Sequence, residues 1–596
     1  MSTTLIDIPN LPAEDIILLD LSAENNLLLD KSVTASNVPI HDLSDETLRE
    51  YIVILKEFEN LADFYDDMET EGGPLYLPHR AVDLADRRPS SRSTHYMLTI
   101  AESIEIVADA RVESVTLTYR ARNLEVKSLS QTSSHWNKSS ILSSTDLNWG
   151  LYRGYIGEPV SNWGSDGDVD TTGTINITNS GHNVDVVICD GHINPLHPEF
   201  AVNSDGTGGS RVIQYNWFQH NMAVRGVAAG TYVYDFLSAG ASYNEHGAHV
   251  AGTAAGNLQG WARGANIYNI SPYSSGTVQA NTIRNWIYYV LNYINQFHIN
   301  KPINPLTGVK NPTIVNMSWT FAGSKDLTQV GNVGFQGATY PPQVNPWSAY
   351  RANLGFVYGL GNIATFLARE SSIDGDVSDC LASGIILVGA AGNFFMYNDV
   401  PGGIDYNNAL YDITTNVPTY YMRGGSPAAA PGVINVSSID NTVDERKANY
   451  SNAGPRTNIF APGSKITSVG LNDGVIDPRN AAYYLLKASG TSMASPQVTG
   501  VLACALETYP TMTPTQVTEY LLTHSSVDQL SNYIPYPDYP FYNFNSLLNG
   551  PNLYLKYTKE RADIGIVTPK TNYFARPTVG IAYPRARANR YSATMP

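Results

Sequence analysis

The stretch VDVVICD (Val184–Asp190) is a short, continuous apolar run that ends in an acidic residue. Runs of this kind are typical of strands in a parallel sheet, because helices cover both faces of such a strand. TIVNMSW (Thr313–Trp319) and GIILVGAAGN (Gly384–Asn393) have the same character, and TIRNWIYYVLNYINQF (Thr282–Phe297) predicts a helix between the first two runs. The pattern predicts an α/β fold with a doubly wound, mostly parallel sheet.

Length, charge and cysteine content limit what the rest of the chain can be. The 596 residues are too many for one hydrophobic core, so we expect at least two domains. A net charge of -17 argues against a nucleic-acid partner, because phosphate binding needs basic surface. The three cysteines (Cys189, Cys380 and Cys504) lie in or beside apolar runs, which predicts buried thiols and no disulfide framework.

The N-terminal residues lack a basic segment followed by an apolar core, and no apolar run reaches the length of a membrane span. From this we expect a chain without signal peptide or transmembrane segment, retained inside the cell or carried in a virion.

The chain divides into five predicted parts, of which the second has the clearest pattern. There, an apolar strand, a helix closed by glycines, a strand, a second helix and a third strand predict a small α+β unit. The parts are an acidic N-terminal arm (1–45), the α+β unit (46–127), a Ser-rich linker (128–147), the α/β domain (148–530), and a Tyr/Pro-rich, basic C-terminal extension (531–596).

Ser492 lies where the stretch KASGTSMASPQVTGVLACAL (Lys487–Leu506) becomes an apolar helix. Thr491, Ser492 or Ser495 would serve as a helix cap, the commonest role of a hydroxyl at this position. A serine there also lies beside free backbone N–H groups, which stabilise an oxyanion if a base activates the hydroxyl. Both interpretations remain open from this stretch alone.

Three further side chains supply the groups that a nucleophilic serine needs. Asp190 ends the first buried strand, His246 lies where NEHGAHVAGTAAG enters a helix, and Asn393 ends VGAAGN. Each also has an ordinary structural interpretation, as a cap, a buried histidine or a turn residue. Together they provide an acid, a base and an amide donor at strand ends or helix N-termini, where open α/β sheets place their sites.

These stretches resemble the subtilisin-like serine proteases (subtilases), and within them the proteinase K type. The resemblance covers roughly residues 148–524 and has the family order Asp, His, Ser. It implies a serine endopeptidase with protein or peptide substrates, without cofactor, in which Asp190, His246 and Ser492 are catalytic and Asn393 binds the oxyanion. It also implies that Ser318, Trp319 and Thr320 begin the strand that aligns the substrate, with Ser318 at its exposed edge.

The unit at 46–127 resembles, more weakly, the inhibitory prodomain of that family. The resemblance implies a self-processed zymogen whose own prodomain binds the enzyme and is cleaved off in the linker.

Three features depart from the family pattern. His192 follows Asp190 closely, and a charge there would change the pH profile of the site. Trp319, Thr320 and Phe321 replace the glycines expected beside the substrate, which predicts a narrowed pocket for the side chain before the scissile bond. A long insertion (322–371) is expected over the cleft or at an interface.

The calcium loop of bacterial subtilisins is missing. Asp166, Asp168 and Asp170 alternate but lack the glycine and glutamate of a calcium loop, so no metal site is predicted and a structural calcium has no supporting motif.

An alternative function is a virion-associated structural or binding protein on a subtilase scaffold with little turnover. The crowded substrate strand, the insertion and a weaker resemblance to subtilase-like proteins of tailed phages favour it. An α/β-hydrolase esterase fits the sequence poorly, because the serine motif is G-T-S-M-A and not G-x-S-x-G, and the residue order differs from that of this class.

Overall fold

The computed structural model describes the central part of the chain almost continuously and several short segments near both ends. The described residues are 18–19, 28–30, 46–82, 91–119, 122, 125–128, 132–135, 146–161, 163, 169–170, 175, 177, 179–221, 230–236, 242–273, 277–278, 281–282, 286–341, 354–355, 363–471, 474–531 and 546–558.

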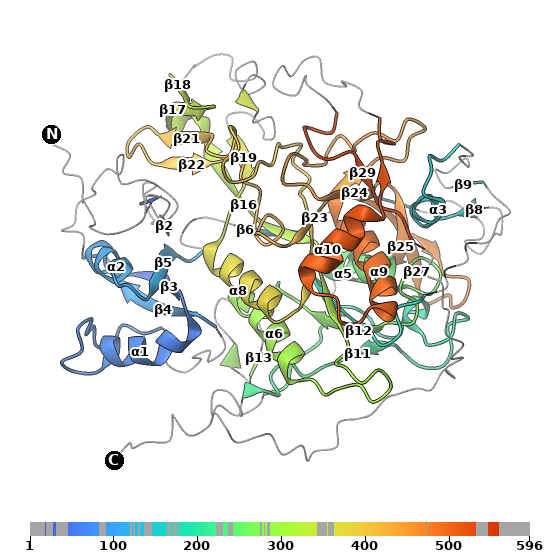
Figure 1. Ribbon diagram of the computed structural model, residues 1–596, viewed down its shortest axis with the longest axis horizontal. Helices are drawn as coiled ribbons and strands as arrows, with labels where there is room; N and C mark the ends of the chain where they lie inside the picture. Colours follow the sequence, from blue (N-terminus) through green and yellow to red (C-terminus); the bar gives the residue numbers. More distant parts are fainter. Residues whose placement is uncertain are drawn as a thin grey trace.

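A nine-stranded sheet forms the centre of the molecule (Figure 1). Its order is β11 (Val212–Ile213), β12 (Asn266–Ile270), β10 (Asp185–Cys189), β15 (Thr313–Met317), β20 (Ile386–Ala390), β23 (Ile434–Ile439), β24 (Ile459–Pro462), β29 (Leu553–Tyr554) and β28 (Ser526–Val527). The three predicted strands β10, β15 and β20 lie side by side. Every pair of neighbouring strands is parallel except the pair of β28 with β29, which is antiparallel. The predicted mostly parallel sheet is confirmed.

Helices cover both faces of this sheet. The helices α5 (Ser242–Ala255) and α9 (Thr491–Thr508) pack together on one face, while α6 (Val290–Asn300) and α8 (Ser371–Ala382) lie on the other. The predicted helix at Thr282–Phe297 therefore begins later than expected. The turn before it is held by the Trp286 indole N–H, which donates to the carbonyl of Ser271 at 2.6 Å.

Strand β10 explains why these strands read as continuous apolar runs. Val186 and Ile188 belong to the core under α5 and α9, whereas Val187 and Cys189 belong to the core under α6 and α8. Successive side chains of a strand point to opposite faces, so a sheet covered on both faces needs apolar residues at every position.

The N-terminal unit has the predicted order of strands and helices. These are β3 (Arg49–Leu55), α1 (Leu61–Glu69), β4 (Ser93–Leu98), α2 (Ile100–Val107) and β5 (Val112–Leu117). A five-stranded antiparallel sheet, in the order β1-β2-β5-β3-β4, carries both helices on one face.

The predicted acidic arm contributes two of these strands, which corrects the prediction. β1 (Leu18–Leu19) pairs with β2 (Leu28–Asp30), and β2 pairs with β5. Short leucine segments carry too little pattern to predict a strand, but the edge of β5 offers them backbone hydrogen bonds.

Strand β3 joins the N-terminal unit to the large domain. Tyr51, Val53 and Leu55 face the unit's own helices, whereas Ile52 and Ile54 belong to the core shared with α6 and α8. In Figure 1 the blue N-terminal unit accordingly lies against the yellow α8. The sheet of this unit is therefore buried on both faces, and the second face is buried by the large domain.

The predicted linker is partly strand, because backbone edges of the large domain pair with it. β6 (Glu125–Ser128) runs antiparallel to β16 (Trp319–Asp326). After three residues, β7 (Thr132–His135) runs antiparallel to β27 (Tyr484–Ser489). Serine-rich composition predicts a loop, and only the long-range pairing makes these segments strands.

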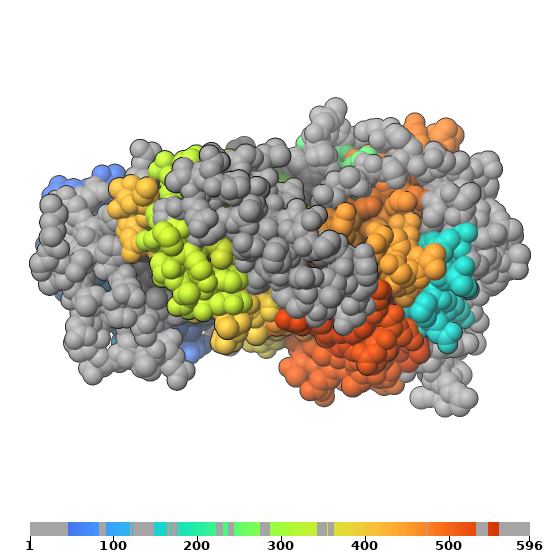
Figure 2. Space-filling model, turned by 90° about the horizontal axis from the view of Figure 1, so that it is seen from above, coloured from blue at the N-terminus to red at the C-terminus, as the bar shows by residue number. Residues whose placement is uncertain are grey.

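The predicted insertion extends β16 into a separate layer. β16 pairs with β19 (Ile363–Leu367), and a second sheet contains β18 (Ala338–Tyr340), β17 (Val330–Phe335), β21 (Ala409–Asp412) and β22 (Pro418–Tyr420). Val417, in the β21–β22 turn, is buried in the core of the N-terminal unit. Figure 2 shows these strands in yellow-green and light orange toward the end of the molecule that carries the blue unit. The turn that follows the insertion's partner strand β21 thus packs against the N-terminal unit, and the start of the insertion at Ala322 pairs with Glu125 of β6.

The C-terminal boundary also differs from the prediction. β29, together with Leu547, Leu548, Leu555 and Tyr557, lies in the main core, so the α/β domain continues to about residue 558 instead of ending at 530. β29 pairs with β24, whose edge would otherwise be open.

The remaining elements include α3 (Trp149–Ile156), α10 (Pro514–Thr523), β25 (Ile466–Gly470), β26 (Val475–Ile476), β8 (Asp146–Leu147), β9 (Val169–Asp170), β13 (Thr277–Val278) and β14 (Asn281–Thr282).

Candidate active site

Asp190 and His246 are joined by a buried hydrogen bond. Asp190 directly follows β10, His246 lies in α5, and Nδ1 of His246 is 2.9 Å from Oδ1 of Asp190. The backbone N–H of Gly191 donates to the same oxygen at 2.7 Å. Gly247 allows this approach, because a Cβ there would collide with the carbonyl of Gly191.

Ser492 is the second residue of α9 and is fully buried. Its hydroxyl donates to the carbonyl of Ser318 at 3.3 Å, and the hydroxyl of Ser318 donates back to the carbonyl of Ser492 at 3.1 Å. In the described part of the chain, Nε2 of His246 has no hydrogen-bond partner. The side chains predicted as nucleophile and base are therefore not hydrogen-bonded to each other here.

The start of α9 is capped by another segment and not by its own serine. Gly490 occupies the N-cap position, and Oδ1 of Asn393 accepts from the backbone N–H of Thr491 at 2.9 Å and from its hydroxyl at 2.8 Å. The capping interpretation of Ser492 is therefore wrong in this structure. The same contacts fix the orientation of the Asn393 amide beside the first turn of α9.

Asn316 is a positioning residue that the sequence analysis missed. It is buried in β15, its Oδ1 accepts from the hydroxyls of Ser495 and Thr499 of α9, and its Nδ2 donates to Oγ of Ser318 at 2.8 Å. The signal was a single amide within an otherwise apolar strand, where a buried polar group needs partners.

Two histidines near the site are neutral at neutral pH. Burial lowers the pKa of His192 to about 4, and Tyr232 and Tyr234 contact its ring at centroid distances of 5.9 and 5.7 Å. The expectation that His192 adds a charge here is wrong, because its surroundings are aromatic. Burial also lowers the pKa of His249 to about 4, and its Nε2 lies 3.0 Å from the carbonyl of Ile466, so this histidine has a structural role.

The predicted substrate strand presents backbone more than side chains. Ser318 is buried and not exposed, since Ser492 contacts it, and the indole of Trp319 is fully buried in the core on the α6 side. The backbone of Trp319 pairs with Ser128 in β6. The buried hydroxyl of Thr320 donates to the carbonyl of Ser426 at 3.2 Å and lies against Gly425, where a Cβ would collide with it.

Within the described residues, no group of three or more His, Cys, Asp or Glu side chains is placed to hold a metal ion. Asp166 and Asp168 of the alternating acidic stretch lie outside these residues. Of the helices that the structure describes, none has the length and apolar character needed to cross a membrane.

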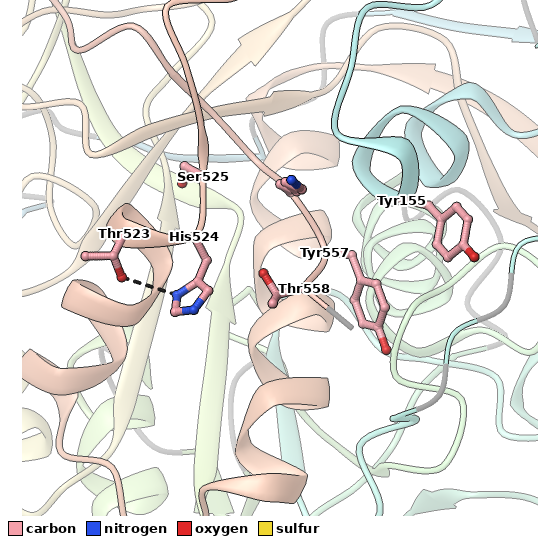
Figure 3. Close-up of a pocket in the computed structure, with 7 residues that line it drawn as sticks. Tyr155, Thr523, His524, Ser525, Tyr557 and Thr558 are labelled. Carbon is pink, nitrogen blue, oxygen red and sulfur yellow. Dashed lines mark hydrogen bonds between the residues drawn. The ribbon is translucent and has the colours of Figure 1, made fainter. Parts of the chain in front are cut away.

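A surface pocket at the C-terminal end of α10 is separate from these residues. Figure 3 shows His524 turned toward the hydroxyl of Thr523, 3.2 Å from it. The pocket is lined by Tyr155, Thr523, His524, Ser525, Lys556, Tyr557 and Thr558. It contains none of the predicted site residues.

Known proteins resemble this chain over the α/β domain. The family model described as "Subtilase family" (Peptidase_S8) matches residues 181–545, which include all four predicted catalytic and oxyanion residues.

An extracellular serine proteinase of Thermus sp. (strain Rt41A) is 25% identical over 307 residues, which are 50% of this chain and 51% of the relative. An extracellular protease of Xanthomonas campestris pv. campestris is 33% identical over 186 residues, 31% of this chain and 26% of the relative. The chain thus spans about half, or less, of the length of these curated relatives.

Among solved structures, fervidolysin from Fervidobacterium pennivorans, a keratinolytic enzyme related to subtilisin, is 16% identical with a TM-score of 0.44. The match covers 93% of this chain and 64% of that one.

Proposed function

Because the chain belongs to the subtilase family, we propose that it is a serine endopeptidase that hydrolyses peptide bonds. The observation that carries the proposal is the buried contact of 2.9 Å between His246 and Asp190, in a domain that also places Ser492 at a helix N-terminus. His246 takes the proton of Ser492, which attacks the scissile carbonyl, and Asp190 holds the imidazole and stabilises its charged form.

Before attack, the Ser492 hydroxyl must leave the carbonyl of Ser318 and turn toward Nε2 of His246. Rotation about one side-chain bond changes the partner of a serine hydroxyl, and catalytic hydrogen bonds often form only with substrate in place. The hydrogen bond to Ser318 therefore describes the resting chain and is compatible with the proposed roles.

The oxyanion is bound by the Asn393 amide and the backbone N–H of Ser492. The Asn393 oxygen is held by Thr491, which orients the amide nitrogen, and the first N–H groups of α9 carry partial positive charge. Preorganised donors of this kind stabilise the transition state without the cost of reorientation.

We further propose that the chain is a zymogen whose N-terminal unit is its own inhibitor. Strand β6 lies antiparallel on β16, beside Ser318, and β7 lies on β27, which leads through Gly490 into Ser492. Residues 129–131 are all that separates the two strands in the sequence. Self-cleavage is expected in this short span, between Ser128 and Thr132.

The contacts between the two units support this inhibitor. Arg92 Nε is 3.1 Å from a carboxylate oxygen of Asp379 in α8, and Arg122 forms a buried ion pair with Glu370 just before α8. The ring of Tyr119 contacts Phe321 of the substrate strand at a centroid distance of 5.6 Å. A unit held by apolar, aromatic and ionic contacts at once remains bound after the linker is cut.

The alternative of a virion-associated scaffold with little turnover has no support among the relatives described above, and we do not propose it. The proteinase K type, the phage origin and the location of the chain stay predictions.

The test is labelling with a fluorophosphonate probe, followed by peptide mass spectrometry, with Ser492→Ala as the control. We expect an adduct on Ser492 and a processed chain whose new N-terminus lies between residues 129 and 132; Ser492→Ala should stay intact and unlabelled. An intact, unlabelled wild-type chain that also stays unlabelled after the linker is cut by an added protease would contradict the peptidase proposal. Labelling without cleavage between Ser128 and Thr132 would contradict only the zymogen proposal.

A further inference from the structure

The loop that carries Asn393 is fixed by Asn452, a buried residue of another segment. The backbone N–H of Asn452 donates to the carbonyl of Gly392 at 2.8 Å. Its side-chain Oδ1 accepts from the backbone N–H groups of Phe394 and Met396, both at 2.9 Å. These bonds lie on both sides of Asn393 in the sequence. The position of Asn452 therefore sets the position of the amide that binds the oxyanion in the proposed mechanism.

Phe395 continues this loop in a backbone conformation that needs support. Its φ of 52° lies in the left-handed region, which residues other than glycine rarely adopt. Its N–H donates to the carbonyl of Tyr450 at 2.8 Å. A residue in this region keeps its conformation only where its surroundings determine it. The loop after Asn393 therefore depends on the segment that contains Tyr450.

Lys447 holds that segment from inside the protein. It is 2% exposed, and its Nζ donates to the carbonyls of Ala448 at 2.9 Å and Ser451 at 2.8 Å, which lie on either side of Tyr450 in the sequence. Nζ also lies 5.1 Å from the centre of the Phe395 ring, a distance at which an aromatic ring attracts a cation. One ammonium group thus contacts both the supporting segment and the loop.

We propose that Lys447 is a positioning residue of the oxyanion site, and that its positive charge keeps the loop of Asn393 in the arrangement that stabilises the transition state. The inference rests on the proposed peptidase function. A preorganised donor is effective only where it meets the developing charge, so a small displacement of the loop lowers the rate. Because Lys447 acts through Phe395 and the supporting segment, its loss should change kcat much more than KM.

The charge of Lys447 changes within the pH range in which a peptidase is assayed. Burial lowers its pKa from 10.5 to about 7, and the negative charge of Asp440, which follows β23, opposes this shift. In the segment of Lys447 itself, Arg446 lies 3.8 Å from Asp444 and stays charged, while burial raises the pKa of Tyr450, which stays neutral. Lys447 therefore carries its charge below about pH 7 and loses it as the pH rises.

The test compares kcat of wild type and Lys447→Met, as processed enzyme on one internally quenched peptide, from about pH 6 to pH 9.5. Methionine retains an unbranched apolar side chain without the charge. We expect wild-type kcat to exceed that of the variant about tenfold at pH 6, with KM equal within about twofold. The ratio of the two kcat values should fall toward one as the pH passes about 8, because the wild-type lysine is then also uncharged. The titration of His246 is common to both enzymes and cancels in this ratio.

Lys301→Met is the matched control. The side chain of Lys301 is 7% exposed, and its Nζ lies 5.0 Å from the centre of the Phe297 ring. It pairs with Asp185 at the start of β10, whereas Asp190 follows the other end of that strand. We expect Lys301→Met to leave kcat unchanged at every pH, even where it lowers stability.

Two further variants test the route from Lys447 to Asn393. Phe395→Leu removes the ring that attracts the ammonium, so it should lower kcat with the same pH dependence, and it serves as the test if Lys447→Met does not fold. In an Asn393→Leu background the positioned amide is absent, so Lys447→Met should lower kcat by less than about twofold more.

Three outcomes overturn this inference while the peptidase function stands. These are a kcat ratio near one at every pH for both variants, a ratio that does not change with pH, and an equal effect of Lys447→Met with and without Asn393. Wild type that neither cleaves the peptide nor takes the fluorophosphonate label overturns the peptidase function and this inference with it.

Discussion

Replacement of His249 by glutamine tests how burial sets the acid stability of the active-site helix. His249 lies one turn after His246 in α5 and is 1% exposed, and its Nε2 lies 3.0 and 3.2 Å from the carbonyls of Ile466 and Leu486. Burial lowers its pKa from 6.5 to about 4. Glutamine retains an amide donor for these carbonyls but does not titrate.

The sign follows from which state takes the proton first. In the unfolded chain His249 protonates near pH 6.5, whereas in the folded chain it stays neutral until about pH 4. The contribution of His249 to the free energy of unfolding is therefore fully present above pH 6.5 and is lost as the pH falls toward 4. One pKa unit corresponds to 1.36 kcal/mol, so the loss at pH 4 amounts to about 3 kcal/mol from this residue.

The assay is denaturant unfolding of the full chain in a Ser492→Ala background, which prevents self-digestion, at pH 7.5 and pH 4. Burial also lowers the pKa values of His192, His220 and His298 to about 4. Their own pH-dependent contributions to the free energy of unfolding are the same in both variants and cancel in the comparison. We expect His249→Gln to lose about 3 kcal/mol less free energy of unfolding between the two pH values than its parent.

The exposed His524 is the control, and His524→Gln should leave the difference unchanged. If His249→Gln retained the full pH dependence of its parent, the argument from burial would be refuted.

Three further predictions concern the site and its inhibitor. Asn393→Leu removes an oxyanion donor and should lower kcat by about 10² to 10³ with little change in KM, measured on a quenched peptide; an unchanged kcat would exclude Asn393 from the oxyanion site. Thr320→Gly with Phe321→Gly should widen the pocket for the residue before the scissile bond, with roughly tenfold higher kcat/KM for bulky residues relative to alanine in a peptide library; an unchanged cleavage profile would mean that these side chains do not limit it. Arg122→Met leaves the fully buried carboxylate of Glu370 without its cation, so it should lower the free energy of unfolding of the uncleaved Ser492→Ala chain by about 3–5 kcal/mol. Adding Glu370→Gln should recover much of this loss, whereas strictly additive losses would show that Arg122 and Glu370 are not coupled.

Much of the large domain could be predicted because its signals are local. Strands β10, β15 and β20 are apolar at every position, since two layers of helices cover them. Asp190, His246, Asn393 and Ser492 stand out at strand ends and helix starts, and the structure joins Asp190 to His246 and Asn393 to the turn that carries Ser492. Their catalytic roles stay predictions until the labelling experiment.

Other features depend on contacts between distant residues, which leave no periodic pattern. The serine-rich β7 is a strand only because the edge of β27, more than 300 residues later, pairs with it, and β29 enters the main core only because β24 has an edge to fill. His192 is neutral because two tyrosines from another segment bury it.

The amino-acid sequence by itself thus determined the class of fold and the residues able to do chemistry. Apolar runs and polar residues beside glycines are local signals, because each is recognised from a few neighbouring positions in the sequence. Only the tertiary structure decided what lies beside the nucleophile, which way the Trp319 side chain turns, and where the domain ends. These depend on which backbone edges and apolar surfaces meet, and that is settled by the packing of the whole chain.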